Sequence, residues 1–236
     1  MLAARVRVRR GAKDEAEKPF WISFADLMTA LMVLFLVVMG VALLAITNHV
    51  TAREQQEAQH RKDVDEIFDR LSQAAARHDG IRIDRARHVI DFGDRARFAF
   101  NKSNLADEQE IVLRQFVPEL IELANSSLGR KVMKRVVVEG YADRTGSYLS
   151  NLNLSLQRSQ RVLCAMFATH GSSLLSELQK ESVRDLFLVG GYSFNASKAS
   201  DEESRRVEMR MEFLGMGEER PSPAVEPGIF GECALP

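Results

Sequence analysis

Residues 20–46 read FWISFADLMTALMVLFLVVMGVALLAI, and this stretch decides how the chain is built. It is almost entirely apolar and contains no proline, so it can form one helix of about 40 Å, which crosses a hydrocarbon layer of about 30 Å with some tilt. A cleaved signal peptide has a much shorter apolar region and ends in an A-x-A-like site, which does not follow here. The stretch therefore predicts a transmembrane helix that remains as an anchor.

One formal charge, Asp26, lies inside this apolar stretch. Insertion scales put a carboxylate at the centre of a membrane helix at roughly 2.5 to 3.5 kcal/mol, so an intramembrane acid usually has a function. Ser23 and Thr29 lie three residues to either side and form a polar stripe with Asp26. We interpret the stripe as an ion-translocating site that faces a partner protein. The alternative is a carboxylate near the membrane boundary that is hydrated or paired with a neighbouring helix.

The same stretch carries a family resemblance. Residues 21–39 resemble the membrane segment of the MotB family of flagellar stator subunits, and EKPFWIS at residues 17–23 makes the chain look closer still to the ZorB family, the stator-like subunits of Zorya anti-phage defence systems. The resemblance implies that Asp26 carries the ion and that a homodimer is surrounded by a pentameric MotA-like (ZorA-like) membrane partner. It also implies a plug outside the membrane, which the sequence does not reveal. We expect a proton rather than sodium, because a proton needs one carboxylate and sodium needs several oxygen ligands.

Charged residues are concentrated in particular segments of the chain. The net charge of -1 gives no basic surface for nucleic acid. A basic cluster precedes the apolar stretch, and the positive-inside rule then predicts a single-pass protein of the bacterial inner membrane with a cytoplasmic N-terminus and a periplasmic C-terminal domain. The cluster also suits contact with anionic lipid. Its members are Arg5, Arg7, Arg9, Arg10 and Lys13.

Changes in composition divide the chain into five predicted regions. They are a cytoplasmic basic tail at 1–19, the transmembrane helix at 20–46, a periplasmic helical linker at 47–80, a soluble domain at 81–214 and a C-terminal tail at 215–236.

Apolar residues recur at helical spacing near the end of the linker, so they predict a stripe that either pairs with its copy in a dimer or docks on the following domain. The stripe consists of Val64, Ile67, Phe68, Leu71 and Ala75.

The soluble domain alternates strand and helix patterns. Strands are predicted at 81–84, 88–92, 135–140, 185–191 and 206–213, and helices at 105–124 and 152–170. This order predicts an α+β fold, a sandwich with helices on one face of a mixed sheet. The tail after Gly215 is rich in Pro, Gly and Glu and is expected to be extended or disordered unless contacts with the domain fix it.

The domain carries a second resemblance. VEGYADRTG at 138–146, Asn151, LSLQR at 154–158 and SRRVE at 204–208 resemble the OmpA-like peptidoglycan-binding domain in order and spacing. The resemblance implies an OmpA-like mixed-sheet α/β sandwich in which Asp143 and Arg158 bind peptidoglycan through a diaminopimelate-type stem peptide. A carboxylate can accept from the ammonium of that zwitterion, and a guanidinium can hold its carboxylate as a planar fork.

Four further residues are assigned to this binding site, with Asn151 also expected as the N-cap of the helix. They are Tyr141, Asn151, Leu152 and Arg205. Two alternatives remain open: Asp143 and Arg158 can form a purely structural ion pair, and Arg205 can stay solvated. The sequence departs from the family pattern at Tyr141-Ala142, where His-Thr is usual, and at Ser204, where Asn is usual.

Catalytic patterns are not found. The histidines are scattered without metal-ligand spacing, and the sequence has no phosphate-binding loop or nucleophile elbow, so we expect no metal, no cofactor and no enzyme activity. Cys164 and Cys233 would lie in an oxidising compartment, where they either form a disulfide that pins the tail or leave Cys164 as a buried thiol.

Together these features predict an ion-conducting, wall-anchored subunit of a rotary membrane motor. The alternatives are a flagellar MotB-type stator subunit, a passive peptidoglycan tether, and a transducer like ExbD or TolR, which shares the single span bearing an Asp.

Overall fold

The computed structural model describes residues 14–222 and 230–233, and it describes side chains from Trp21 onward except that of Ile22. The predicted basic cluster therefore lies outside the described residues. The chain divides into two compact units, Met1–Gln56 and Glu57–Pro236, and each is described by itself.

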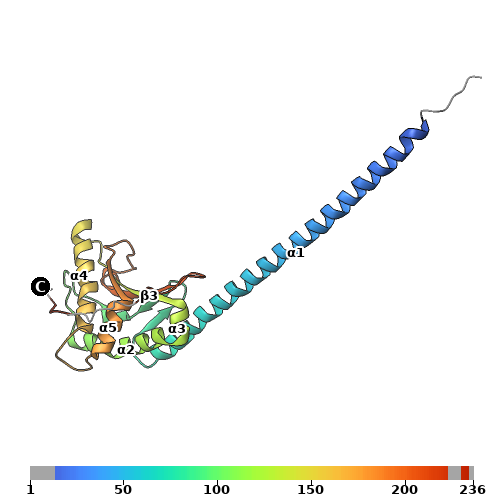
Figure 1. Cartoon of the computed structure of the whole chain (residues 1–236). Coiled ribbons are helices and arrows are strands. Elements are labelled where there is room, and N and C mark those ends of the chain that lie inside the picture. The colour runs from blue at the N-terminus through green and yellow to red at the C-terminus, as the bar shows by residue number, and fades with distance from the viewer. Residues whose placement is uncertain (1–13, 223–229, 234–236) are drawn as a thin grey trace, which may run out of the picture. The chain divides into compact units, whose positions relative to one another are not determined.

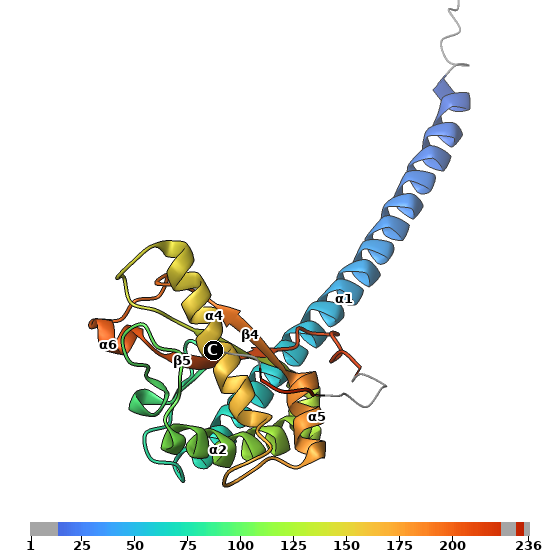
Figure 2. The same cartoon turned by 90° about the vertical axis from the view of Figure 1, so that its left-hand side faces the viewer.

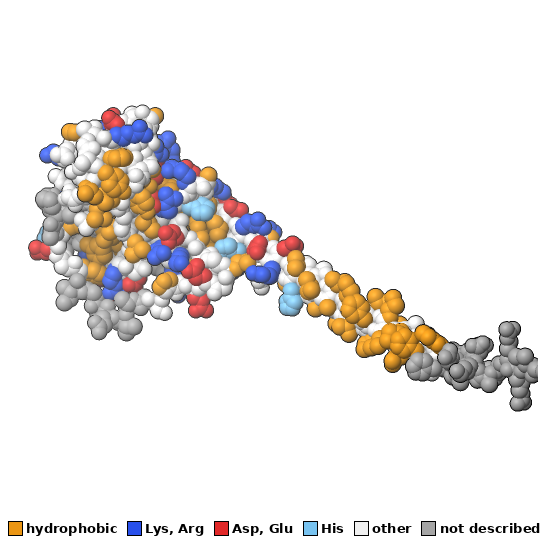
Figure 3. All heavy atoms as spheres, turned by 90° about the horizontal axis from the view of Figure 1, so that it is seen from above, with side chains coloured by type: hydrophobic (Ala, Val, Ile, Leu, Met, Phe, Trp, Pro, Cys, Tyr) orange, Lys and Arg blue, Asp and Glu red, His pale blue; other side chains and the backbone are white. Residues whose placement is uncertain are grey.

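The first unit contains most of the long helix α1, whose bounds are Asp14–Ala75. Within the described residues this is one helix that is long and apolar enough to cross a membrane. Its apolar side chains are exposed, as at Leu34 and Phe35, and they form the continuous orange band on the helix in Figure 3. The predicted transmembrane stretch is therefore helical and offers an apolar surface.

The second unit is built on a mixed five-stranded sheet in the order β1-β2-β5-β3-β4. β3 and β4 are parallel and the other neighbours are antiparallel, so the α+β fold predicted from the sequence is confirmed. The strands are β1 Arg82–Asp84, β2 Val89–Asp91, β3 Met133–Gly140, β4 Phe187–Gly191 and β5 Val207–Phe213.

Several helices follow α1 (Figures 1 and 2), and their bounds correct some of those expected. The helix expected at 152–170 begins four residues earlier because Ser147 caps it and its hydroxyl accepts from the backbone N–H of Ser150. It also ends four residues earlier, at Met166. The helix Glu177–Leu186 was not predicted. The elements are η1 Gly93–Ala96, α2 Asp107–Asn125, α3 Ser127–Val132, α4 Tyr148–Met166, α5 Glu177–Leu186 and α6 Asp201–Ser204.

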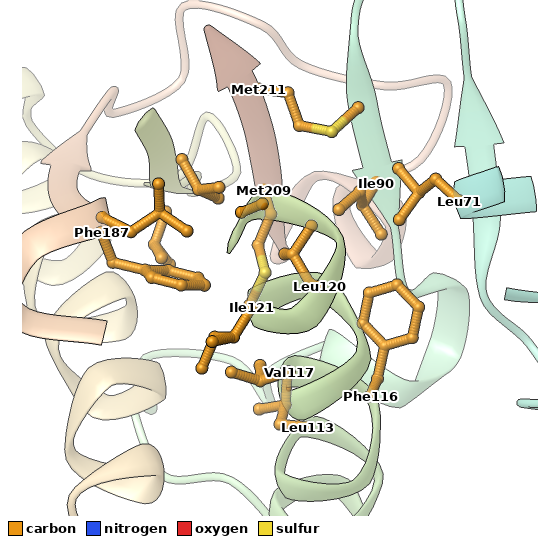
Figure 4. Close-up of a cluster of buried hydrophobic side chains, with 14 of the residues drawn as sticks. Leu71, Ile90, Leu113, Phe116, Val117, Leu120, Ile121, Phe187, Met209 and Met211 are labelled. Carbon is orange, nitrogen blue, oxygen red and sulfur yellow. The ribbon is translucent and has the colours of Figure 1, made fainter. Parts of the chain in front are cut away.

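The core lies between the sheet and the helices, and the last turns of α1 are part of it. Ile67, Phe68 and Leu71 are fully buried in the same cluster as the apolar face of α2. Figure 4 shows Leu71 beside Ile90 of β2, with Phe116 of α2 close by. Of the two possibilities for the linker stripe, the structure shows docking on the domain.

The tail is fixed to the domain at several described points, of which two are the most extensive. Arg220 donates to the backbone carbonyls of Met133 at 2.9 Å, Ala124 at 3.0 Å and Gly129 at 3.0 Å. Cys164 of α4 is joined to Cys233 by a disulfide, with 5.8 Å between the Cα atoms. Of the two alternatives for the cysteines, the structure therefore shows the bridge.

Candidate functional site

The candidate site forms where α4 lies directly against the ends of β3 and β4. A Cβ atom at Gly140 would lie 1.8 Å from the carbonyl oxygen of Ser155, and one at Gly191 would lie 2.8 Å from the backbone nitrogen of Leu156. Glycine is therefore required at both strand ends for the helix to approach this closely. The contact places Arg158, one turn further along α4, beneath the loop that follows β3.

Arg158 is buried completely and holds three segments together. Its guanidinium donates to the carbonyls of Lys102 at 2.9 Å, Tyr141 at 2.8 Å and Ala99 at 3.4 Å. The guanidinium also lies 5.0 Å from the ring centre of Phe98. Burial lowers the pKa of Arg158 to about 10, while the nearby Asp143 carboxylate opposes that shift.

Asp143 lies in the loop after β3 and has a different partner from the one expected. Its Oδ2 accepts from Nη1 of Arg205 at 3.1 Å, and its Oδ1 accepts from the backbone N–H of Thr145 at 2.9 Å. Nε of Arg205 also donates to the carbonyl of Phe98 at 3.1 Å. No direct ion pair joins Asp143 to Arg158 in the described part of the chain, so the structural pair considered above is Asp143–Arg205 instead.

The guanidinium groups of Arg158 and Arg205 therefore both lie near the carboxylate of Asp143. The side chain of Asp143 is 5% exposed and that of Arg205 is 17% exposed, while Arg158 is not exposed. The surplus positive charge suits an anionic group, and the single carboxylate suits a cationic one. The geometry is that of a small polar site in which one carboxylate lies near two guanidinium groups.

The other predicted site residues are placed as follows. Asn151 is not the N-cap of α4, because the helix begins at Tyr148. Its amide nitrogen donates to the carbonyl of Thr145 at 3.0 Å, so it fixes the Asp143 loop to α4. Leu152 is half-buried on α4 near this loop.

The side chain of Tyr141 belongs to a different environment. Its hydroxyl donates to Glu139 at 2.7 Å, and the guanidinium of Arg206 lies 4.2 Å from the centre of its ring. Its carbonyl, which accepts from Arg158, is the part of Tyr141 that belongs to the site. The backbone of Tyr141 therefore belongs to the site, while its ring takes part in a buried ionic network with Glu139 and Arg206. A role of Tyr141 in binding peptidoglycan stays a prediction.

Sequence reasoning missed the segment at 98–102. Phe98, Ala99 and Lys102 contribute backbone carbonyls to Arg158 and Arg205. Backbone acceptors leave no signature in the identity of a residue, so no motif pointed to them.

The second candidate site is the polar stripe of α1. The hydroxyl of Thr29 donates to the carbonyls of Ala25 at 2.8 Å and Asp26 at 2.9 Å, so it stays on the helix backbone. Ser23, Asp26 and Thr29 are exposed on the helix, and the carboxylate of Asp26 has no partner among the described residues.

Two protein families match this chain, one over the N-terminal helix and one over the domain. The OmpA family matches residues 97–222, and a family described as the membrane MotB of the proton-channel complex MotA/MotB matches residues 5–47. The fold and these matches define the class: a MotB-like protein with one N-terminal apolar helix and an OmpA-family domain.

A curated relative narrows the class. The Zorya protein ZorB of Escherichia coli O139:H28 (strain E24377A / ETEC) is 44% identical over 216 residues, which cover 90% of this chain and 88% of that protein. The chain belongs to the ZorB family.

Solved structures were also compared with the chain. A MotB-like protein from Desulfovibrio vulgaris has 16% identity and a TM-score of 0.41, and the match covers 65% of this chain and 98% of that one. The OmpA-like domain of FopA1 from Francisella tularensis subsp. tularensis SCHU S4 has 20% identity and a TM-score of 0.37, covering 57% and 82%.

Proposed function

We propose that this protein is the ion-conducting, wall-anchored subunit of a MotA/MotB-like rotary membrane motor that serves anti-phage defence. The observation that carries the proposal is Asp26, a lone carboxylate in an apolar helix within the segment that matches the MotB family. The defence role rests on membership of the ZorB family, since the relative is named as a Zorya protein.

In this proposal, two copies place their α1 helices inside a ring of a pentameric MotA-like partner. Asp26 is protonated from one side of the membrane and deprotonated to the other as protons move down their gradient. One charge that crosses 100 mV releases about 2.3 kcal/mol, which can bias a rotation step when many steps accumulate. We prefer a proton to sodium because one carboxylate suffices for a proton, whereas a sodium site needs several oxygen ligands, which Ser23 and Thr29 alone do not supply.

The OmpA-family domain holds the motor to the wall. The Asp143, Arg158 and Arg205 site binds the amine and carboxylate of a diaminopimelate-type stem peptide, and no catalytic step is involved. The N-terminus faces the cytoplasm of the bacterial inner membrane and the domain faces the periplasm, by the positive-inside rule. The anchored core then stays still while the partner ring turns around it.

The test is Asp26→Asn in the complete system, expressed together with its membrane partner. We expect full loss of protection in phage plating and loss of proton flux in vesicles, while the variant still co-purifies with the partner. Asp26→Glu keeps a carboxylate and should retain part of both activities. Asp65→Asn, which removes an exposed acid from the linker part of α1, is the matched control and should behave like wild type.

The same experiment separates the motor from a passive tether. A tether needs no ionisable group in the membrane, so unchanged protection by Asp26→Asn would reject the motor and favour the tether. Loss of co-purification in that variant would show instead that Asp26 serves assembly.

A further inference from the structure

In the proposed binding site, the charged groups of Asp143 and Arg158 are already hydrogen-bonded to other groups of the protein. Both oxygens of the Asp143 carboxylate already accept hydrogen bonds, from Thr145 and Arg205. The guanidinium of Arg158 is fully buried and each of its three nitrogens donates to a backbone carbonyl. Neither member of the expected zwitterion-binding pair is therefore open to a ligand in this arrangement.

Arg205 is the member that a ligand meets first. Its side chain is 17% exposed, compared with 5% for Asp143 and none for Arg158. It lies directly before β5 and reaches across to two other segments, the Asp143 loop and the carbonyl of Phe98. It is therefore the most exposed charged group that contacts the Asp143 carboxylate.

We propose that Arg205 is an exchangeable internal counter-ion that makes the site specific for a zwitterion. In the ligand-free protein its guanidinium neutralises Asp143. When a ligand binds, its ammonium group replaces the guanidinium at Asp143, and its carboxylate binds the released guanidinium. This inference rests on the proposed peptidoglycan binding and adds how the site selects its ligand.

The energetic reason is that removing one partner from a buried ion pair leaves an uncompensated charge, which is strongly unfavourable. A ligand that carries an ammonium alone would displace Arg205 and leave it with no anion. A ligand that carries a carboxylate alone would draw Arg205 away and leave Asp143 buried without a cation. A group with an amine beside a carboxylate gives both Asp143 and Arg205 a new partner of opposite charge, so it alone avoids both penalties.

Three ligands with matched carbon chains test this exchange on the full chain in detergent micelles. Meso-diaminopimelate carries amine and carboxylate at each end, cadaverine carries the two amines alone, and pimelate carries the two carboxylates alone. For the wild-type protein, calorimetry should give binding of diaminopimelate at least about tenfold tighter than binding of either of the others.

The decisive variant is Arg205→Gln. It should weaken diaminopimelate binding and strengthen cadaverine binding, because Asp143 is then free to accept an amine, and the preference between the two should fall by about tenfold or more. Arg205→Lys keeps a cation next to Asp143 and should restore part of the preference. Arg144→Gln, whose Nε contacts Ser197 at 3.3 Å, removes a neighbouring positive charge without touching Asp143 and is the matched control.

The outcomes separate this inference from the proposed function. If Arg205→Gln loses diaminopimelate affinity but gains none for cadaverine, Arg205 is a simple ligand contact and the exchange is wrong. If Arg144→Gln changes the preference as strongly, general electrostatics explain it and the exchange is again wrong. If the wild-type protein binds neither diaminopimelate nor purified sacculi, the proposed wall binding fails and the inference fails with it.

Discussion

Replacing Arg158 with methionine should destabilise the domain by about 2 to 3 kcal/mol, since methionine fills similar space but donates nothing. The bond to the Tyr141 carbonyl is buried and is worth about 2 kcal/mol, and the partly buried bonds to Lys102 and Ala99 are worth about 1 kcal/mol each. Removing the buried guanidinium also relieves part of its desolvation cost, roughly 1 to 2 kcal/mol.

The expected fall in melting temperature is about 5 to 10 °C for a domain of this size, measured by circular dichroism on the full chain in micelles. Arg158→Lys retains the charge and can reach some of the carbonyls, so it should lose about half as much. Both variants should also fail to sediment with purified sacculi.

Two other variants make the test specific. Arg135→Met removes an arginine paired with Glu212 at the surface and should cost less than about 1 kcal/mol. Asp143→Asn should also abolish sedimentation, although it leaves the three carbonyls of the Arg158 site satisfied. An Arg158→Met protein that melts within about 1 °C of wild type would refute the reasoning, because the three carbonyls would then need no donor.

Two further predictions concern the sheet. Burial alone raises the pKa of Glu208, but Arg206 brings it below its ordinary value of 4.5, so its stabilising effect is present above that pH and is lost as the pH falls through the folded-state pKa. Glu208→Gln should therefore cost about 3 kcal/mol at pH 7 and flatten the decline in melting temperature between pH 5 and about 3, whereas parallel curves for variant and wild type would contradict this. Gly140→Ala should cost at least about 3 kcal/mol, because its Cβ would meet the Ser155 carbonyl at 1.8 Å. Gly215→Ala, with its nearest neighbour at 3.6 Å, should leave the urea midpoint unchanged, and equal midpoints for both variants would show that α4 can move aside.

The sequence predicts the strands of the domain because their signals are local. The alternation of β5 is plain, and its apolar members Met209 and Met211 are indeed buried. The same alternation suggests a solvated polar face, yet Glu208 on that face is fully buried. Arg87 and Arg206 cover it with their long side chains, an effect that residue type alone does not predict.

The helix bounds were harder to predict, although readable signals existed. Ser147 caps α4, and a reciprocal capping box between Ser176 and Gln179 starts α5. Both are the residue types expected at a helix start. For α5 the capping signal stands almost alone, because the helix is short and its apolar residues are few.

The site itself was predictable as a set of residues but not as a set of contacts. Asp143, Arg158 and Arg205 were named from the motifs, and the structure brings them together. The pairing of Asp143 with Arg205 spans 62 positions, and the acceptors for Arg158 are backbone carbonyls 56 and 59 positions away. Contacts of this kind follow from the fold, so a single sequence with no structure does not contain them.

The boundary between linker and domain has a mechanical consequence. A domain that began at residue 81 would lack Ile67, Phe68 and Leu71, whose burial is worth about 2 kcal/mol each, or about 6 kcal/mol together. That sum is comparable with the whole stability of a typical domain, so the end of α1 and the sheet fold as one unit. In the proposed motor, a load carried by α1 therefore passes through Ile67, Phe68 and Leu71 into the hydrophobic core of the domain that binds the wall.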